Sequence, residues 1–311
     1  MTHSTGSLHS ESPSETGQAP ESRFVGINGL KLHYFEWPGN GRPLLFVHGS
    51  NHCAGIWSPL AENLSDTFHV YALDLRGHGQ SEKPETGYAW TNLRDDIVEL
   101  LRQLDLHDVL FVSHSRGGGA TLLACAQAAE RVRGAVMYEP NISAAMALAN
   151  PDGRHGPATD RLQERAQRRY AVFPSRQAFY DRYRNRDAFK NWREDFFVAY
   201  MDHGTRTLEN GEVELQCSPF TEAQLMEEMP KTEAWVGLKD VSVPTLVCHG
   251  DGRGPVAGAG VGEAAGDPSY GFRKILPSAK IVYMPGCSHN GYQEKPELFE
   301  QHIRDFERTL R

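Results

Sequence analysis

One stretch of the sequence, residues 110–124, constrains the fold more than any other. It reads Leu-Phe-Val-Ser-His-Ser-Arg-Gly-Gly-Gly-Ala-Thr-Leu-Leu-Ala. The apolar start predicts a short buried strand, and the small residues after it predict the first turn of a helix. A strand that turns sharply into a helix needs small residues beside the turn, because larger side chains would collide there. We therefore expect Ser115, at the apex, to have a strained backbone and an exposed hydroxyl at a helix N-terminus, which favours a nearby anion.

The rest of the chain has the pattern of an α/β protein with a mostly parallel central sheet flanked by helices. Residues 24–37 alternate apolar and polar side chains around Asn28-Gly29, which is typical of a tight hairpin turn. A helical apolar stripe runs through 90–104, and a closing helix is expected at 298–310. Short apolar runs predict the other strands, at 44–47, 69–73, 109–112, 135–138, 244–248 and 280–284. Polar and glycine-rich motifs follow these strands, at the edge where open α/β sheets place their sites.

The pattern changes between residues 141 and 239, where apolar runs are scarce and arginine, aspartate and aromatic residues are frequent. Four amphipathic helices are expected there, at 161–170, 176–183, 189–200 and 222–229. We interpret this part as a helical cap inserted into an α/β core made of 23–140 and 240–311. Residues 1–22, rich in Ser, Thr, Glu, Gly and Pro, are expected to be a disordered tail. The glycine-rich segment 252–266 is either a mobile flap or a link without a role.

Composition excludes several classes of partner. The net charge of −8 gives no reason to expect nucleic acid or an anionic membrane surface, and no apolar run is long enough to span a bilayer. The start of the chain lacks the basic and apolar regions of a secretory signal. The five cysteines are an odd number without metal-ligand spacing. We therefore expect a cytoplasmic protein without a metal or cofactor.

Four motifs give the chain a family resemblance. Residues 113–117, Ser-His-Ser-Arg-Gly, resemble the nucleophile elbow G-x-S-x-G of α/β-hydrolases, with Ser113 in place of the first glycine. His48-Gly49, the stretch Asp-Leu-Arg-Gly-His-Gly-Gln-Ser at 74–81, and Gly-Cys-Ser-His at 286–289 follow the family's order. The resemblance covers residues 24–311 and implies a serine hydrolase of the α/β-hydrolase fold.

A serine hydroxyl needs a base to take its proton, and the base needs a third group to hold its tautomer. The resemblance implies Ser115 as the nucleophile and His289 as the base. It also implies an oxyanion hole made by the backbone N–H groups of Ser50 and Arg116. The predicted substrate pocket has three further side chains, of which the last, beside the nucleophile, is expected to pack rather than to transfer protons: Asn51, Trp57 and His114.

The acid departs from the usual family pattern. Most members carry an aspartate three residues beyond the His249-Gly250 pair, but this chain has Arg253 there, and arginine cannot accept a hydrogen bond. Two carboxylates are candidates: Asp251 in the same loop, and Glu139 after the strand 135–138. Certain dehalogenases and zearalenone-type lactone hydrolases carry their acid at the latter strand end, and glutamate adds a methylene of reach. We therefore predict Glu139 as the acid, with Asp251 as the alternative.

These residues predict a cofactor-independent hydrolase that cleaves a carboxylic ester or lactone through an acyl-enzyme. Aromatic residues in the inserted part indicate an apolar, bulky small-molecule substrate, unless they form that part's own core. The serine at the elbow argues against epoxide hydrolases and haloalkane dehalogenases, which use aspartate there. Cleavage of a carbon–carbon bond or an amide stays open, as does a ligand receptor on the same fold with slow or no turnover.

Overall fold

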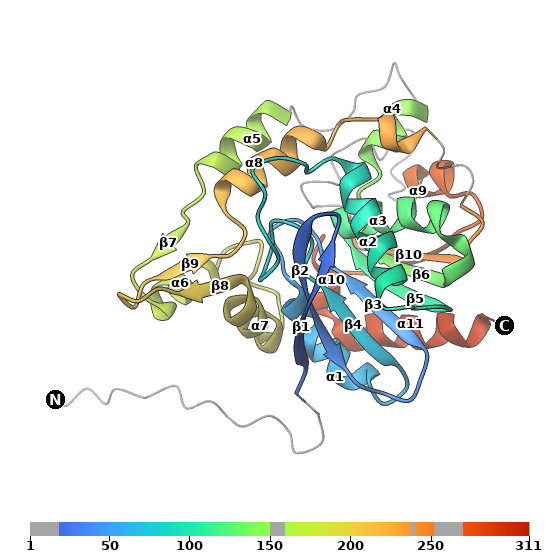
Figure 1. Ribbon diagram of the computed structural model, residues 1–311, viewed down its shortest axis with the longest axis horizontal. Helices are drawn as coiled ribbons and strands as arrows, with labels where there is room; N and C mark the ends of the chain where they lie inside the picture. Colours follow the sequence, from blue (N-terminus) through green and yellow to red (C-terminus); the bar gives the residue numbers. More distant parts are fainter. Residues whose placement is uncertain (1–18, 150–158, 237, 239–240, 252–269, 311) are drawn as a thin grey trace.

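A computed structural model describes residues 19–149, 159–236, 238, 241–251 and 270–310. Its centre is an eight-stranded sheet with the order β1-β2-β4-β3-β5-β6-β10-β11 (Figure 1). The pairs from β4 to β11 are parallel, whereas β1 and β2 pair antiparallel with their neighbours. The strands are β1 (Glu21–Ile27), β2 (Leu30–Trp37), β3 (Pro43–Val47), β4 (His69–Leu73), β5 (Val109–His114), β6 (Val132–Tyr138), β10 (Thr245–His249) and β11 (Lys280–Tyr283). The predicted fold class is confirmed.

The first hairpin turns at the predicted dipeptide. Asn28 and Gly29 both have positive φ, 50° and 79°, as a tight turn between β1 and β2 requires. β1 begins at Glu21, so residues 21–22, which the sequence assigned to the tail, belong to the sheet. Pairing with β2 orders this end, and Ser22 Oγ lies 2.9 Å from His33 Nε2. Residues 1–18 lie outside the described residues.

Helices cover both faces of the sheet. α2 (Trp90–Gln103) and α3 (Ser115–Gln127) lie on one face, and α1 (Ser58–Leu64) and α11 (Pro296–Thr309) on the other (Figure 1). Successive side chains of a buried strand enter opposite cores. In β3, Leu45 and Val47 pack with the first pair of helices, whereas Leu44 and Phe46 pack with the second. The short helical elements around this core are η1 (Ala54–Trp57), η2 (Ala129–Arg131), α9 (Tyr270–Ile275) and α10 (Gly291–Glu294).

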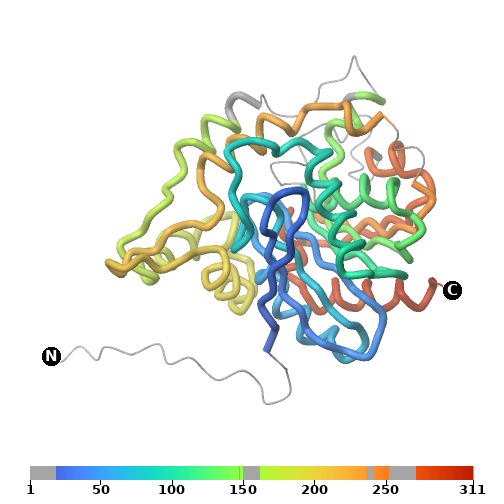
Figure 2. The backbone as a smooth tube through the Cα atoms, in the orientation of Figure 1, coloured from blue at the N-terminus to red at the C-terminus, as the bar shows by residue number. Residues whose placement is uncertain are grey.

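An insertion occupies the interval between β6 and β10 and lies beside the central sheet (Figure 2). Its helical elements are α4 (Ser143–Ala149), α5 (Thr159–Gln167), α6 (Arg176–Tyr183), α7 (Glu194–Gly204), α8 (Pro219–Glu228) and η3 (Glu233–Trp235). α5 packs on α8, and α7 packs on η1 and α1 of the core. Its aromatic side chains Phe179, Phe196, Phe197 and Tyr200 are buried with core residues in one apolar cluster. Those rings therefore form packing of the insertion, which was the alternative to a bulky apolar pocket.

The sequence predicted a purely helical insertion, but the insertion also contains a small sheet. An antiparallel sheet of order β7-β9-β8 is formed by β7 (Val172–Phe173), β8 (Thr205–Thr207) and β9 (Val213–Leu215). Strands of two or three residues are too short to produce a recognisable alternation. α7 also begins at Glu194 instead of residue 189, because the Arg184 guanidinium binds the carbonyls of Phe189, Lys190 and Trp192 and holds that segment in turns.

No helix among the described residues has the length and apolar composition needed to cross a membrane. The five cysteines are free and buried. The predicted flap or link at 252–266 lies outside the described residues.

Candidate active site

The turn between β5 and α3 places Ser115 at the first position of the helix, with a positive φ of 50°. A β-carbon on Gly117 would stand 2.3 Å from the carbonyl oxygen of His48 and 2.5 Å from that of Val47. Only glycine therefore allows α3 to approach the end of β3 so closely. Ser113, where the resemblance expects glycine, is fully buried.

His289 lies between Ser115 and Glu139. Its Nε2 is 3.1 Å from Ser115 Oγ, and its Nδ1 is 2.6 Å from Glu139 Oε2. The three residues are 6–8% exposed, so these contacts are largely shielded from water. The structure thus brings together the three residues that the sequence nominated as nucleophile, base and acid.

The carboxylate on His289 comes from the end of β6 and not from the loop after β10. Glu139 follows β6 directly with a φ of 40°, and its second oxygen, Oε1, accepts the Gly250 N–H at 3.0 Å. Asp251, the alternative acid, is exposed, and its Oδ1 accepts the Tyr283 hydroxyl at 2.5 Å and the Gly286 N–H at 3.2 Å. Glu139, by contrast, has both oxygens engaged, Oε1 by the Gly250 N–H and Oε2 by His289 Nδ1, and these contacts fix the carboxylate against the imidazole.

The loop that carries His289 is held from three sides. The Tyr138 hydroxyl donates to the Ser288 carbonyl at 2.7 Å, and the Ser288 N–H donates to Glu294 at 2.7 Å. His114 Nε2 donates to the His289 carbonyl at 2.8 Å. Sequence reasoning missed Tyr138 and Glu294. The only signal for Tyr138 was its place beside Glu139.

His114 is a neutral structural imidazole. Burial, reinforced by His289 and His52, lowers the pKa of His114 well below its usual range. Its ring stacks on His52 at 5.4 Å between centroids and lies 4.8 Å from the ring of His289. These contacts agree with the packing role expected for His114.

The two residues nominated for the oxyanion hole are joined by a side-chain contact. Arg116 Nε donates to Ser50 Oγ at 3.0 Å, and another guanidinium nitrogen donates to the Leu225 carbonyl of α8. The Arg116 side chain is 1% exposed and lies 4.8 Å from the Trp90 ring. Burial lowers the pKa of Arg116 to about 10, so it is still a cation near neutral pH. The loop and the nucleophile are close, because a β-carbon on Gly49 would lie 3.2 Å from that of Ser115.

The two remaining pocket candidates differ in their surroundings. Asn51 has a φ of 64°, and its Nδ2 donates to Glu222 Oε1 of α8 at 2.8 Å. Trp57 is fully buried, with its ring stacked between Phe46 at 4.6 Å and Tyr292 at 4.3 Å. Trp57 is therefore a core side chain, not the pocket wall that the sequence predicted, because the close packing of η1 on the sheet encloses it.

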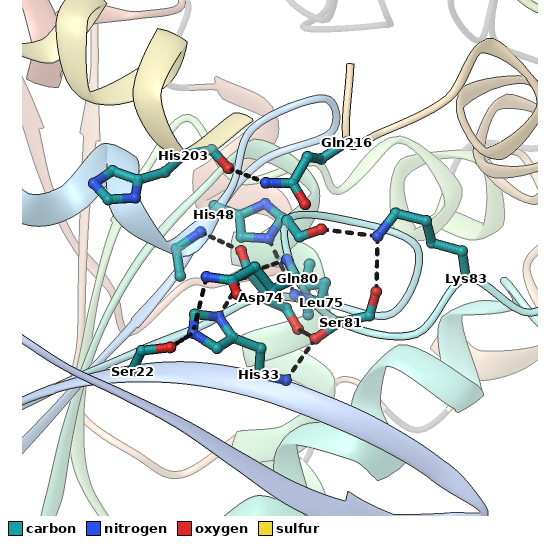
Figure 3. Close-up of polar contacts among 12 residues, drawn as sticks. Ser22, His33, His48, Asp74, Leu75, Gln80, Ser81, Lys83, His203 and Gln216 are labelled. Atoms are coloured by element: carbon teal, nitrogen blue, oxygen red, sulfur yellow. Dashed lines mark hydrogen bonds and ion pairs between the residues drawn. The ribbon is translucent and has the colours of Figure 1, made fainter. Parts of the chain in front are cut away.

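The stretch 74–81 forms a turn that supports the loop after β3 (Figure 3). Asp74 Oδ2 lies 2.7 Å from His33 Nδ1 and accepts the Gln80 N–H at 2.9 Å. The Leu75 N–H donates to His48 Nε2 at 3.1 Å, which fixes the residue just before Gly49. This motif is therefore scaffolding for the loop that carries Ser50.

Backbone strain concentrates at the site. Six non-glycine residues of the described chain have positive φ, and three of them are Asn51, Ser115 and Glu139. Such conformations cost about 1–3 kcal/mol each and persist where the surroundings hold them. Within the same described residues, no group of three or more His, Cys, Asp or Glu side chains is arranged as a metal site.

Comparison with known proteins agrees with this geometry. A model of the alpha/beta hydrolase family matches residues 44–302. The chain belongs to the alpha/beta hydrolase family. A 2-(acetamidomethylene)succinate hydrolase of Mesorhizobium japonicum is 28% identical over 92% of this chain and 94% of that protein. A non-heme chloroperoxidase of Kitasatospora aureofaciens is 29% identical over 84% of this chain and 90% of that protein.

Among solved structures, that of E-2-(acetamidomethylene)succinate hydrolase superposes with a TM-score of 0.75. It is 26% identical in sequence, and the match covers 93% of this chain and 100% of the other. The family is therefore shown by sequence and by fold together.

Proposed function

We propose that this alpha/beta hydrolase is a cofactor-independent serine hydrolase that works through an acyl-enzyme. The observation that carries the proposal is the chain of contacts from Ser115 Oγ through His289 to Glu139, 3.1 Å and 2.6 Å long. A hydroxyl becomes a useful nucleophile when an imidazole can accept its proton and a carboxylate fixes the tautomer of that imidazole. This site offers both in one buried line.

The reaction has two halves. His289 Nε2 accepts the Ser115 proton while Oγ attacks the substrate carbonyl, and the imidazolium then returns the proton to the leaving oxygen or nitrogen. Water, deprotonated by the same nitrogen, attacks the acyl-enzyme, and Ser115 recovers its proton as the acid leaves. The oxyanion of each tetrahedral intermediate is bound by the N–H groups of Ser50 and Arg116, and Glu139 stabilises the imidazolium.

We propose a carboxylic ester or lactone as the substrate. The serine nucleophile supports acyl transfer, and an acid at the end of β6 is an arrangement that zearalenone-type lactone hydrolases also use. The substrate is expected to be a small molecule, in keeping with the family.

A second candidate substrate is an amide that also carries carboxylate groups. The Mesorhizobium relative is named for an acetamido group on a succinate, which is such a compound. The feature of this chain that favours it is Arg116, a buried cation one residue after the nucleophile. Within the described residues its Nη1 has no hydrogen-bond partner, so a substrate carboxylate would complete its surroundings.

A fluorophosphonate probe and a substrate panel test these proposals together. The wild-type protein is expected to be labelled on Ser115 and to hydrolyse p-nitrophenyl esters or lactones, whereas Ser115→Ala should be neither labelled nor active. Comparing neutral acetamides with acetamides of dicarboxylates distinguishes the second candidate. Wild-type protein that takes up no label and turns over no compound would support the receptor alternative and contradict the proposed function.

A further inference from the structure

The two proposed oxyanion donors come from separate parts of the chain. Ser50 lies in the loop after β3, and Arg116 is the second residue of α3. Two N–H groups stabilise one oxyanion only if both point at the same place, so the distance between these segments must be fixed. The Arg116 guanidinium supplies one link, through its 3.0 Å hydrogen bond to Ser50 Oγ.

Both segments are also held by one helix of the insertion. The Leu225 carbonyl of α8 accepts from the Arg116 guanidinium, and Glu222 Oε1 of α8 accepts from Asn51 Nδ2 at 2.8 Å. Glu222 and Leu225 are three residues apart and so lie on the same side of the helix. We propose that α8 fixes the two segments that carry the oxyanion donors relative to each other, and that Glu222 is a positioning residue. This inference rests on the proposed function.

Asn51 is the residue through which Glu222 contacts the loop that carries Ser50. Its φ of 64° lies in the left-handed region, which asparagine tolerates better than most residues with a side chain, and neighbouring groups fix it there. The Asn51 N–H lies 3.3 Å from His78 Nε2, and its side chain is held by Glu222. Because Asn51 is bonded to Ser50, anchoring Asn51 through both contacts limits how far the Ser50 peptide can move.

Glu222 is itself fixed. Its Oε2 accepts from Arg169 at 3.0 Å, and Arg169 also donates to the Tyr200 hydroxyl of α7 at 2.8 Å. The Glu222 and Arg169 side chains are both 15% exposed, so this pair is poorly screened by water. The far end of α8 is tied to the core, because Trp90 Nε1 donates to the Met229 carbonyl at 3.3 Å.

The geometry has a kinetic consequence. Glu222 acts on groups that bind the oxyanion, which exists in the tetrahedral intermediate and not in the bound substrate. Loss of a whole oxyanion donor costs about 10²–10³ in kcat, and a misplaced donor should cost part of that. Removing Glu222 should therefore lower kcat while leaving KM nearly unchanged.

The test compares Glu222→Ala and Glu222→Gln with Glu214→Gln, a matched control. Glu214 lies in β9 of the same insertion and pairs with Arg206 on the surface at 2.6 Å. With p-nitrophenyl butyrate, Glu222→Ala should lower kcat about 10- to 100-fold and weaken inhibition by an alkyl trifluoromethyl ketone by a similar factor, since that inhibitor forms the oxyanion. Glu222→Gln should do less, and Glu214→Gln should match wild type in both measurements.

Asn51→Ala adds a second readout. If Glu222 acts through Asn51, the double variant should lose no more activity than the worse single variant. An unchanged kcat and inhibitor affinity in both Glu222 variants would overturn the inference, as would a raised KM at constant kcat or additive losses in the double variant. If Glu222→Ala fails to fold, Glu222→Gln and Asn51→Ala decide. Absence of Ser115-dependent turnover in wild type would instead refute the proposed function itself.

Discussion

Replacing Glu139 by glutamine changes one atom at the centre of the proposed triad. The carboxylate has two acceptor oxygens: Oε1 takes the Gly250 N–H at 3.0 Å, and Oε2 contacts His289 Nδ1 at 2.6 Å. Glutamine has one acceptor and one donor at these positions. If its NH₂ faced Gly250, two donors would meet in a buried site, at a cost of about 1–3 kcal/mol.

The favoured orientation therefore keeps the amide oxygen on Gly250 and turns the NH₂ toward His289 Nδ1. That nitrogen must then accept, so the ring proton moves to Nε2, the atom that faces Ser115 Oγ at 3.1 Å. An Nε2–H cannot take the serine proton. In another serine hydrolase the equivalent change lowers kcat about 10⁴-fold, which corresponds to about 5.4 kcal/mol, and we expect a loss of about 10³- to 10⁴-fold here.

The assay is kcat on the best substrate of the panel, with Asp251→Asn as the matched control. The Asp251 oxygen that accepts from Tyr283 and Gly286 becomes an amide oxygen in asparagine and can keep both contacts. Asp251→Asn should stay within about threefold of wild type, since an exposed polar change of this kind is usually mild. Thermal unfolding should show both variants folded. Near-wild-type activity of Glu139→Gln, or an equal loss in Asp251→Asn, would refute the assignment of the acid.

Two further predictions concern stability. Burial lowers the pKa of His78 and His114 well below their usual range and that of His48 less far, so only the unfolded chain gains these protons below about pH 6.5. The free energy of unfolding, measured in urea, should therefore decrease as the pH is lowered, by up to ~1.4 kcal/mol per pH unit for each imidazole. Equal free energies of unfolding at pH 7.5 and 5.5 would contradict this reasoning. Gly117→Ala would place a methyl 2.3 Å from the His48 carbonyl and should cost about 3 kcal/mol or more in the same measurement, whereas Gly26→Ala, with open space around it, should cost little.

The sequence predicted those features that local pattern determines. Alternation around Asn28-Gly29 placed the first hairpin, and the small residues after Ser115 predicted a turn whose φ of 50° the structure then shows. Periodicity carries no such information for strands as short as Val172–Phe173, which is why the small sheet was missed. Nor can it tell a pocket wall from a core side chain, as Trp57 illustrates.

The contacts between the insertion and the loop after β3 were beyond prediction for a different reason. Asn51 and Glu222 are 171 residues apart, and an amphipathic pattern in residues 222–229 indicates a buried face without naming its partner. The preference for Glu139 over Asp251 rested instead on the family resemblance, which allows an acid at that strand end, and on the extra reach of a glutamate. Pairing of side chains across the fold requires the fold.

The position of the carboxylate follows from the order of the strands. β6 lies between β5, which carries Ser115, and β10, which most family members extend into the acid-bearing loop. An acid on β6 starts one strand away from the nucleophile, and glutamate reaches His289 from there. β10 still contributes, because the Gly250 N–H fixes the second Glu139 oxygen. Asp251 ties the end of β11 to the loop that carries His289, through Tyr283 and Gly286. The ends of β6 and β10 thus both support the His289 imidazole. β6 supplies the carboxylate, and the loop after β10, where the acid is usual, supplies a backbone N–H that binds this carboxylate.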